Sequence, residues 1–551
     1  MLETVPCWVV KKGKTMLSRR FSRLATPFHS NLSCKTNPSK LGIYAHFTTQ
    51  VPRRPHSSWI NTSLVLGVTV ISTFAAYHYL TKSSPNESVG LTANEYIRKR
   101  LSEREQSHVF PYHPLIPRID VSQLASNNPC EDRYAIYPLT DGHGWIMVVC
   151  DGHAGTECAE LVHKELPKRV VQGLAELPVD ASHPIKNAQD VERVLIQAFE
   201  SLDNDIIHQR AKEALALVDK NTPLVYGSID DGVIEKGRIL LEPAVAGCCT
   251  VLAYLDTISD RLTVACTGDS RVVLGQIPTL DDSGSSNNTN DMIWEVVRVT
   301  QDQTLRNPLE RARFIAEHPN ESPDTLTARN RILGGLEPTR AFGDARYKWT
   351  REISDRIHAT FFPDKRGTPA ASLTPPYVTA RPEVTHIEGV SDRVKCIVMA
   401  TDGLWDGMRD DQVIQILHEH ARIHKQDIHS SAANENTSLV SAIKNQLSST
   451  SLVAKSSIWA HEDGNAATCL IRNELGGRNK EKIQRLLKLE APISRRYRDD
   501  ITVLVMWLDN RREGMARAWQ DDVKKQWQTG VNVVGKVKGG LKPALQKDDD
   551  A

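Results

Sequence analysis

Acidic side chains at the ends of apolar stretches are the residues of this chain best placed to do chemistry. In the octet Val148–Gly155 an apolar run stops at Asp151, which is followed by Gly152 and His153. A buried strand that stops in this way delivers a carboxylate and an imidazole to its exposed end, and the glycine lets the backbone turn tightly there. On its own, an Asp-Gly pair after a strand is more often just a turn.

The same arrangement recurs far along the chain. Other carboxylates that flank strand-like apolar runs are Glu131, Asp132, Asp269, Asp402, Asp406, Asp499 and Asp500. Carboxylates gathered from distant strands repel one another unless cations neutralise them. A ligand set of oxygen atoms, without Cys or His, favours Mg²⁺ or Mn²⁺. Two such ions that share carboxylates suit the hydrolysis of a phosphate ester by water bound to the metal.

Six short motifs carry these residues in a fixed order. They are Glu131-Asp132, Asp151-Gly152-His153-Ala154-Gly155, Gly268-Asp269-Ser270-Arg271, Thr339-Arg340-Ala341-Phe342-Gly343-Asp344, Thr401-Asp402-Gly403-Leu404-Trp405-Asp406 and Arg498-Asp499-Asp500-Ile501-Thr502. The ordered set resembles the metal-dependent protein phosphatases of type 2C, the PPM family. Within that family, residues 128–133 and 497–502 look most like the mitochondrial pyruvate dehydrogenase phosphatase branch.

The resemblance covers roughly Leu115 to Asn510. It implies an α+β fold, a central antiparallel β-sandwich flanked by helix pairs. It also implies that Asp151 bridges two metal ions, that the carbonyl of Gly152 is a second ligand, and that Asp402 and Asp499 complete the core of the site. Each Asp alone is as well explained by a turn, but turns do not account for this order of motifs.

Further roles also follow from the resemblance. Glu131 and Asp132 match acidic residues that bind the metals directly or through water. Asp269 and Asp406 match positions that hold a weaker third metal in some relatives, although Asp269 would also serve as a turn cap. His153 matches the general acid that protonates the leaving seryl or threonyl oxygen; the alternative is a histidine that only hydrogen-bonds water at the metals.

Two positions depart from the family pattern. Many relatives carry a phosphate-binding arginine four residues before the Glu-Asp pair, where this chain has Asn127, and Arg133 is a candidate substitute. Asp500 stands where asparagine is more common, and an extra acid would raise the demand for metal. Arg340 is expected to fix its own loop rather than to bind phosphate.

Charge is unevenly distributed along the 551 residues. The net charge is +1, yet residues 1–86 hold eleven Lys and Arg and one acid, which leaves 57 basic and 66 acidic residues, net −9, in the remainder. A mildly acidic body argues against nucleic acid as a partner. The ten cysteines show neither zinc spacing nor a disulfide framework. We expect those in apolar runs to be buried thiols, and Cys248 and Cys249 not to be nucleophiles.

The N-terminal part resembles a targeting and anchoring region. Residues 1–58 are rich in Arg, Lys, Ser and Thr, as in a mitochondrial targeting segment, although a basic disordered tail has the same composition. Residues 59–80 contain no Lys, Arg, Asp or Glu and are long enough for a transmembrane helix; a buried core helix is the alternative. Arg53 and Arg54 precede this segment, which predicts a matrix-facing N-terminus and a catalytic domain in the intermembrane space. A pyruvate dehydrogenase phosphatase would instead have to meet its substrate in the matrix.

The remaining organisation follows from hydrophobic periodicity. We expect a linker with a short helix over 81–114, in which Thr92 and Glu95 form a capping box. The phosphatase domain would span 115–510, and a charged tail 511–551. Within the domain, helical patterns cover 155–171, 191–217 and 307–318, strands cover 244–256, 261–275 and 294–300, and residues 320–380 are mostly irregular.

The sequence therefore predicts a membrane-tethered mitochondrial protein serine/threonine phosphatase with two Mg²⁺ or Mn²⁺ ions. Its partners would be phosphorylated proteins, with pyruvate dehydrogenase expected from the resemblance. The alternative is a catalytically weak, phosphatase-like protein that holds phosphoproteins at a membrane, which Asn127 favours. The acidic body disfavours a two-metal nuclease.

Overall fold

The computed structural model describes residues 91–110, 113–139, 142, 144–178, 186–221, 229–278, 293–424 and 457–509. The predicted targeting segment, transmembrane helix and charged tail all lie outside these residues. Among the residues that are described, no helix is both long and apolar enough to cross a membrane.

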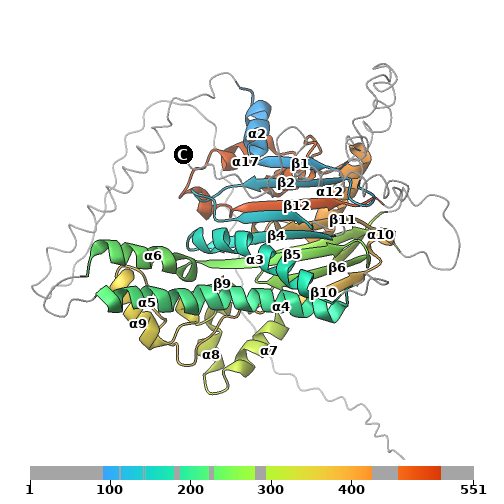
Figure 1. The fold of residues 1–551 in the computed structure, drawn as a ribbon. Helices are drawn as coiled ribbons and strands as arrows, with labels where there is room; N and C mark the ends of the chain where they lie inside the picture. The colour runs from blue at the N-terminus through green and yellow to red at the C-terminus, as the bar shows by residue number, and fades with distance from the viewer. Residues whose placement is uncertain are drawn as a thin grey trace, which may run out of the picture. The chain divides into compact units, whose positions relative to one another are not determined.

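Two antiparallel sheets form the centre of the described part (Figure 1). The first has the strand order β1 (Glu105–Val109), β2 (Arg118–Leu124), β12 (Ile501–Trp507), β11 (Val394–Ala400), β7 (Arg271–Gln276) and β8 (Glu295–Arg298). The second has the order β10 (Glu383–Glu388), β6 (Arg261–Thr267), β5 (Gly247–Asp256), β4 (Gly144–His153) and β3 (Arg133–Pro138), and the two-residue strand β9 (Phe342–Gly343) pairs with β5.

The two sheets share one apolar core, so they form a sandwich. Val121 and Ile397 from the first sheet pack in the same buried cluster as Met147 and Val251 from the second. A helix layer covers the outer face of each sheet. The second sheet packs against α3 (Glu157–Glu176), α4 (Ala188–Asn204) and α6 (Asp231–Val245), and the first against α2 (Ala93–Ser102), α12 (Asp410–Ile423), α16 (Ala466–Leu475) and α17 (Lys480–Leu487). The predicted α+β sandwich flanked by helices is confirmed.

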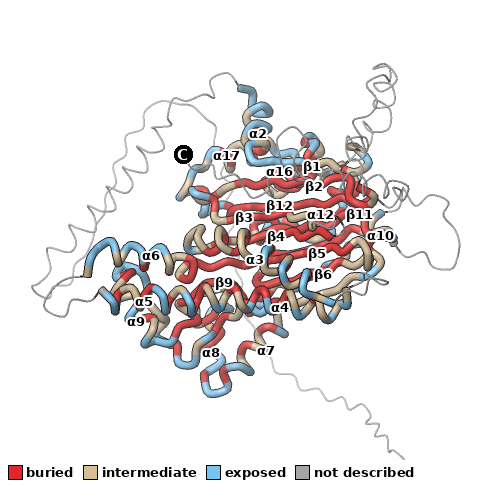
Figure 2. The backbone as a smooth tube through the Cα atoms, viewed as in Figure 1, coloured by how far each residue is buried: buried red, intermediate tan, exposed pale blue. Residues whose placement is uncertain are grey.

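Burial explains why the central strands are apolar along their whole length. Strands β5 and β12 are buried at every position, because one face meets the opposite sheet and the other meets helices (Figure 2). The edge strands β8 and β10 are largely exposed or half-buried. In α4, by contrast, the buried residues recur at helical spacing.

Several predicted elements have different bounds in the structure. The capping box of Thr92 and Glu95 is present, but α2 ends at Ser102 and the chain continues as β1. The pattern over 191–217 is interrupted by a π-helical turn at Asp205–Gln209, after which α5 (Arg210–Asn221) begins. Residues 320–380 also contain a helix, α9 (Arg351–Phe361).

The predicted strand over 261–275 is in fact two strands that belong to different sheets. The chain leaves β6 and enters β7 through Gly268, whose φ is +111°. A Cβ at Gly268 would lie 2.4 Å from the Sγ atom of Cys249, so the crossing passes too close to β5 for any other residue. The crossing places Asp269 at one end of the sandwich.

A buried ion pair fixes the Thr339–Asp344 motif against α7 (Pro308–Glu317). The carboxylate of Glu310 accepts hydrogen bonds from Arg340, from Arg313 at 2.7 Å and from the hydroxyl of Thr339 at 2.7 Å. Burial acts to raise the pKa of Glu310, but these hydrogen bonds outweigh it and lower the pKa to about 2. Arg340 therefore holds its own loop, as the sequence analysis predicted.

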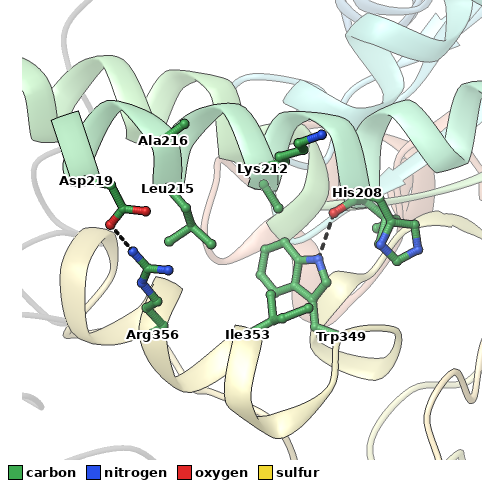
Figure 3. Close-up of a pocket in the computed structure, with 10 residues that line it drawn as sticks. His208, Lys212, Leu215, Ala216, Asp219, Trp349, Ile353 and Arg356 are labelled. Carbon is green, nitrogen blue, oxygen red and sulfur yellow. Dashed lines mark hydrogen bonds and ion pairs between the residues drawn. The ribbon is translucent and has the colours of Figure 1, made fainter.

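A pocket of about 370 Å³ lies between α5 and α9 (Figure 3). The indole of Trp349 lines it and donates a hydrogen bond to the carbonyl of Ile207 at 2.8 Å. Arg356 and Asp219 form an ion pair at its edge. None of the acidic residues singled out in the sequence lines this pocket.

We predict that Glu310→Gln lowers the free energy of unfolding by about 3 kcal/mol, because it leaves Arg340 buried without its main counter-charge. The pKa of Glu310 is lower in the folded state than the value of about 4.3 expected in the unfolded chain. Its stabilisation is therefore complete above that value and is lost as the pH falls toward 2. Urea unfolding of the full chain at several pH values should show wild type and variant converging over this range.

The matched control is Glu317→Gln. Glu317 binds the same Arg313 at 2.7 Å, but its side chain is 53% exposed. This substitution should cost less than about 1 kcal/mol. Equal losses for the two variants would contradict a special role for the buried pair.

Candidate active site

Three carboxylates from distant parts of the chain meet at one end of the sandwich. Asp151 lies near the end of β4, Asp402 begins the short helix α11 (Asp402–Trp405) directly after β11, and Asp269 lies in the crossing from β6 to β7. One oxygen from each lies within 4.8 Å of the others. We call these three residues the carboxylate cluster.

The electrostatics of the carboxylate cluster suit a divalent cation. Burial raises the pKa of Asp151 and Asp402 well above the usual range, and the charges of the neighbouring carboxylates raise them further. The Oδ1 atom of Asp402 is buried without a hydrogen-bond partner. Such an oxygen is costly to bury unless a cation or a proton satisfies it. The donors are hard carboxylate oxygens, which fit Mg²⁺ or Mn²⁺.

Glu131 is held close to the carboxylate cluster by backbone contacts. Its Oε1 atom accepts a hydrogen bond from the amide of Gly155 at 2.7 Å. A Cβ at Gly152 would lie 2.3 Å from the carbonyl oxygen of Glu131, so only glycine fits at this point of β4. Glu131 thus packs directly against the backbone of Gly152 and Gly155, next to Asp151.

Asp132 is fully buried and joins three elements. Its Oδ2 atom accepts hydrogen bonds from the hydroxyls of Thr401 at 3.0 Å and Thr502 at 2.8 Å, which link β3 to the start of α11 and to β12. Burial and the charge of Asp500 raise its pKa well above the usual range.

Asp499 and Asp406 border the carboxylate cluster without belonging to it. Asp499 forms an ion pair with Arg495, and its charge contributes to the raised pKa of Asp151 and Asp402. Asp406 is exposed one helical turn after Asp402, and its amide donates to the carbonyl of Asp402 at 2.8 Å.

His153 has a partner that the sequence analysis did not identify. Its Nε2 atom lies 2.8 Å from the Oδ2 atom of Asp344, a residue with a left-handed φ of +51°. Burial acts to lower the pKa of His153, but the charge and the hydrogen bond of Asp344 outweigh it and raise the pKa to about 9. The signal in the sequence was that Asp344 closes one of the six motifs, but nothing local connected it to His153.

Both departures from the family pattern have structural explanations. Asp500 accepts hydrogen bonds from the backbone amides of Ser126, Asn127 and Glu131 at 2.5, 2.8 and 2.7 Å. It therefore holds the loop before β3, a role that the sequence analysis did not predict for this extra acid. The side-chain amide (Nδ2) of Asn127 donates hydrogen bonds to Glu131 at 2.9 Å and to Asp500 at 3.1 Å. Asn127 therefore has a structural task of its own.

Arg133 is not available as the substitute for a phosphate-binding arginine. Its guanidinium contacts Glu160 at 2.5 Å and the carbonyls of Cys130 and Asp132 at 2.7 and 2.8 Å.

The cysteines near the site are buried, and burial raises the pKa of the Cys248 and Cys249 thiols well above the usual range. Protonated thiols of this kind are poor nucleophiles, as predicted.

Comparison with known proteins assigns this chain to a family. The family model described as protein phosphatase 2C matches residues 130–449. The crystal structure of a serine-threonine phosphatase 2C from Toxoplasma gondii aligns with a TM-score of 0.40 and 15% identity over 74% of this chain and 99% of that chain. The chain belongs to the protein phosphatase 2C family and is a metal-dependent protein serine/threonine phosphatase.

Two relatives show how much of the chain is shared. A protein phosphatase 2C homolog of Schizosaccharomyces pombe is 35% identical over 444 residues, which cover 79% of this chain and 89% of that protein. The human protein named pyruvate dehydrogenase (acetyl-transferring)-phosphatase 1, mitochondrial, is 29% identical over 567 residues, which cover 90% of this chain and 96% of that protein.

The alternative of a catalytically weak binding protein is not needed to explain Asn127, because the side chain of Asn127 holds the loop at the site.

We predict that Asp344→Asn moves the basic limb of the kcat pH profile by about one pH unit or more toward lower pH. A histidine whose folded-state pKa is raised keeps its proton up to that pKa, and removing the Asp344 charge removes the main cause of the rise. Asparagine tolerates the left-handed backbone at this position. NMR titration of the His153 ring in wild type and variant would measure the shift directly.

Asp219→Asn provides the control, because Asp219 pairs with Arg356 at the surface, away from His153. Its pH profile should match that of wild type. If the Asp344→Asn profile also matched wild type, Asp344 would not set the protonation of His153.

Proposed function

We propose that this phosphatase holds two Mg²⁺ or Mn²⁺ ions between Asp151, the carbonyl of Gly152, Asp402 and Asp499. Glu131 and Asp132 would bind these ions directly or through water, and Asp269 and Asp406 would serve a weaker third ion. The convergence of Asp151, Asp269 and Asp402, with an unsatisfied buried oxygen on Asp402, is the observation that carries the proposal.

The proposed hydrolysis also needs a residue that gives a proton to the leaving group. Cations bound at these carboxylates supply the Lewis-acid chemistry that activates water and neutralises the phosphoryl oxygens. Asp344 orients His153 through Nε2 and keeps the ring charged. The proton on the other ring nitrogen, Nδ1, then goes to the leaving seryl or threonyl oxygen. No residue becomes phosphorylated in this scheme.

We further propose that the substrate is a mitochondrial phosphoprotein, with pyruvate dehydrogenase first among those to test. The support is the similarity to proteins named mitochondrial pyruvate dehydrogenase phosphatases, 29% identical over 90% of this chain in the human case. The basic, acid-poor composition of residues 1–58 agrees with import into mitochondria. Such a substrate favours the matrix over the intermembrane space that the flanking charges predicted.

The metal proposal predicts phosphate release from a phosphoserine protein with Mn²⁺ or Mg²⁺ and none with a chelator. Asp151→Asn and Asp402→Asn should each lower kcat by at least about a hundredfold and weaken Mn²⁺ binding in calorimetry, because each removes an oxygen donor from the carboxylate cluster. Asp411→Asn, a change of an exposed acid on α12, should leave both unchanged. Full activity in chelator would contradict the proposal.

The substrate proposal predicts faster release from phosphorylated pyruvate dehydrogenase than from an unrelated phosphoprotein at equal concentration, measured as kcat/KM. Protease protection of mitoplasts tests the compartment. Digestion of the catalytic unit in intact mitoplasts would place it in the intermembrane space and would contradict direct action on a matrix enzyme.

A further inference from the structure

Arg495 lies at the edge of the active site on the short helix Ser494–Arg496. It forms an ion pair with Asp499, and 42% of its side chain is exposed. Burial acts to lower the pKa of Arg495, but the hydrogen bond and charge of Asp499 outweigh it, and the charges of Asp500 and Asp402 add to the rise. Its charge in turn acts on Glu131. The guanidinium of Arg495 thus contacts Asp499, and its charge interacts with carboxylates on two further segments, at Asp402 and Glu131.

Hydrogen bonds attach the helix of Arg495 to the loop that carries Asn127. The hydroxyl of Ser494 donates to the carbonyl of Ser126 at 2.5 Å, and the hydroxyl of Ser126 donates to the carbonyl of Arg498 at 2.7 Å. These bonds tie the residue before Arg495 to the residue before Asn127, and the charge of Arg495 acts on Glu131, to which the side chain of Asn127 donates a hydrogen bond.

The other two arginines weighed for phosphate binding are each held by several partners. Arg133 binds Glu160 and two backbone carbonyls, and Arg340 binds the buried Glu310. Arg495 differs because it is half exposed and its partner is a carboxylate proposed to face a cation. A carboxylate shared with a cation holds a guanidinium less tightly, so the side chain can turn toward an incoming anion.

We propose that Arg495 binds the phosphoryl group of the phosphoserine or phosphothreonine substrate, in the place that an arginine at position 127 would take. The proposal rests on the function proposed above for the same site. A planar guanidinium fork matches two phosphoryl oxygens, and its positive charge offsets the repulsion between the phosphate and the surrounding acids. Arg495 is thus a specificity determinant for phosphate, and it is supplied by the short helix before β12 instead of by the loop that carries Asn127.

The test compares wild type with Arg495→Ala, Arg495→Lys and Arg496→Ala, all as the full chain. Arg496 is the neighbouring exposed arginine on the same turn and serves as the matched control. The direct measurement is calorimetric binding of a peptide that carries a non-hydrolysable phosphonate in place of phosphoserine, with Mn²⁺ present. Kinetics on the phosphopeptide and Mn²⁺ binding complete the comparison.

We expect Arg495→Ala to weaken binding of the phosphonate peptide about tenfold to a hundredfold and to raise KM similarly, with Mn²⁺ binding unchanged or tighter. Arg495→Lys should recover part of the loss, because it keeps the charge but not the fork. Arg496→Ala should match wild type. Unchanged peptide affinity in Arg495→Ala, or a loss explained by weaker Mn²⁺ binding, would overturn the proposal.

The two proposals fail in different ways. If wild type releases phosphate only with metal but Arg495→Ala binds the phosphonate peptide equally well, only the role of Arg495 is refuted. If wild type neither binds Mn²⁺ nor needs it for activity, the metal centre is refuted and the role of Arg495 with it.

Discussion

The repulsion between Asp151, Asp269 and Asp402 is the constraint on which the rest of the site depends. Two unit charges 4.8 Å apart repel by about 3 kcal/mol at an effective dielectric constant of about 20. Three such pairs approach the whole net stability of a domain, about 5–15 kcal/mol. The folded chain therefore keeps these acids together only with a cation between them or with protons on them. The raised pKa of each acid expresses the same constraint.

The sandwich supplies the rigidity that such a site requires. Each member of the carboxylate cluster follows or ends a strand that is buried against the opposite sheet, so none can move away without opening the shared core. Two further acids, Asp132 and Asp500, accept hydrogen bonds that hold together the segments around the carboxylate cluster. Asp132 binds two threonine hydroxyls, and Asp500 binds backbone amides of the loop before β3. Adjacent acids in one motif, Asp499 and Asp500, thus have different tasks.

The sequence was sufficient for features that depend on local pattern. Apolar runs that end in Asp151 and Asp402 predicted buried strands with a carboxylate at the end, and both occupy such positions. What it did not reveal depends on contacts between distant segments. The pairing of His153 with Asp344 joins residues 191 positions apart, and the loop-holding role of Asp500 joins residues more than 360 apart. The crossing at Gly268 was missed because both flanking strands are equally apolar and only their sheet partners differ.

Two positively charged side chains, His153 and Arg495, lie close to the carboxylates of the site, and each has an acidic partner. His153 is held by Asp344 and Arg495 by Asp499, and both partners lie outside the carboxylate cluster. A guanidinium or imidazolium among the carboxylates of the cluster would compete there with a divalent cation. Asp344 and Asp499 hold the two positive charges beside the cluster, where the proposed mechanism needs them for the phosphate and its leaving oxygen. Asp499 is itself proposed to bind a cation, so the site would share this carboxylate between a metal ion and the arginine proposed to bind the substrate.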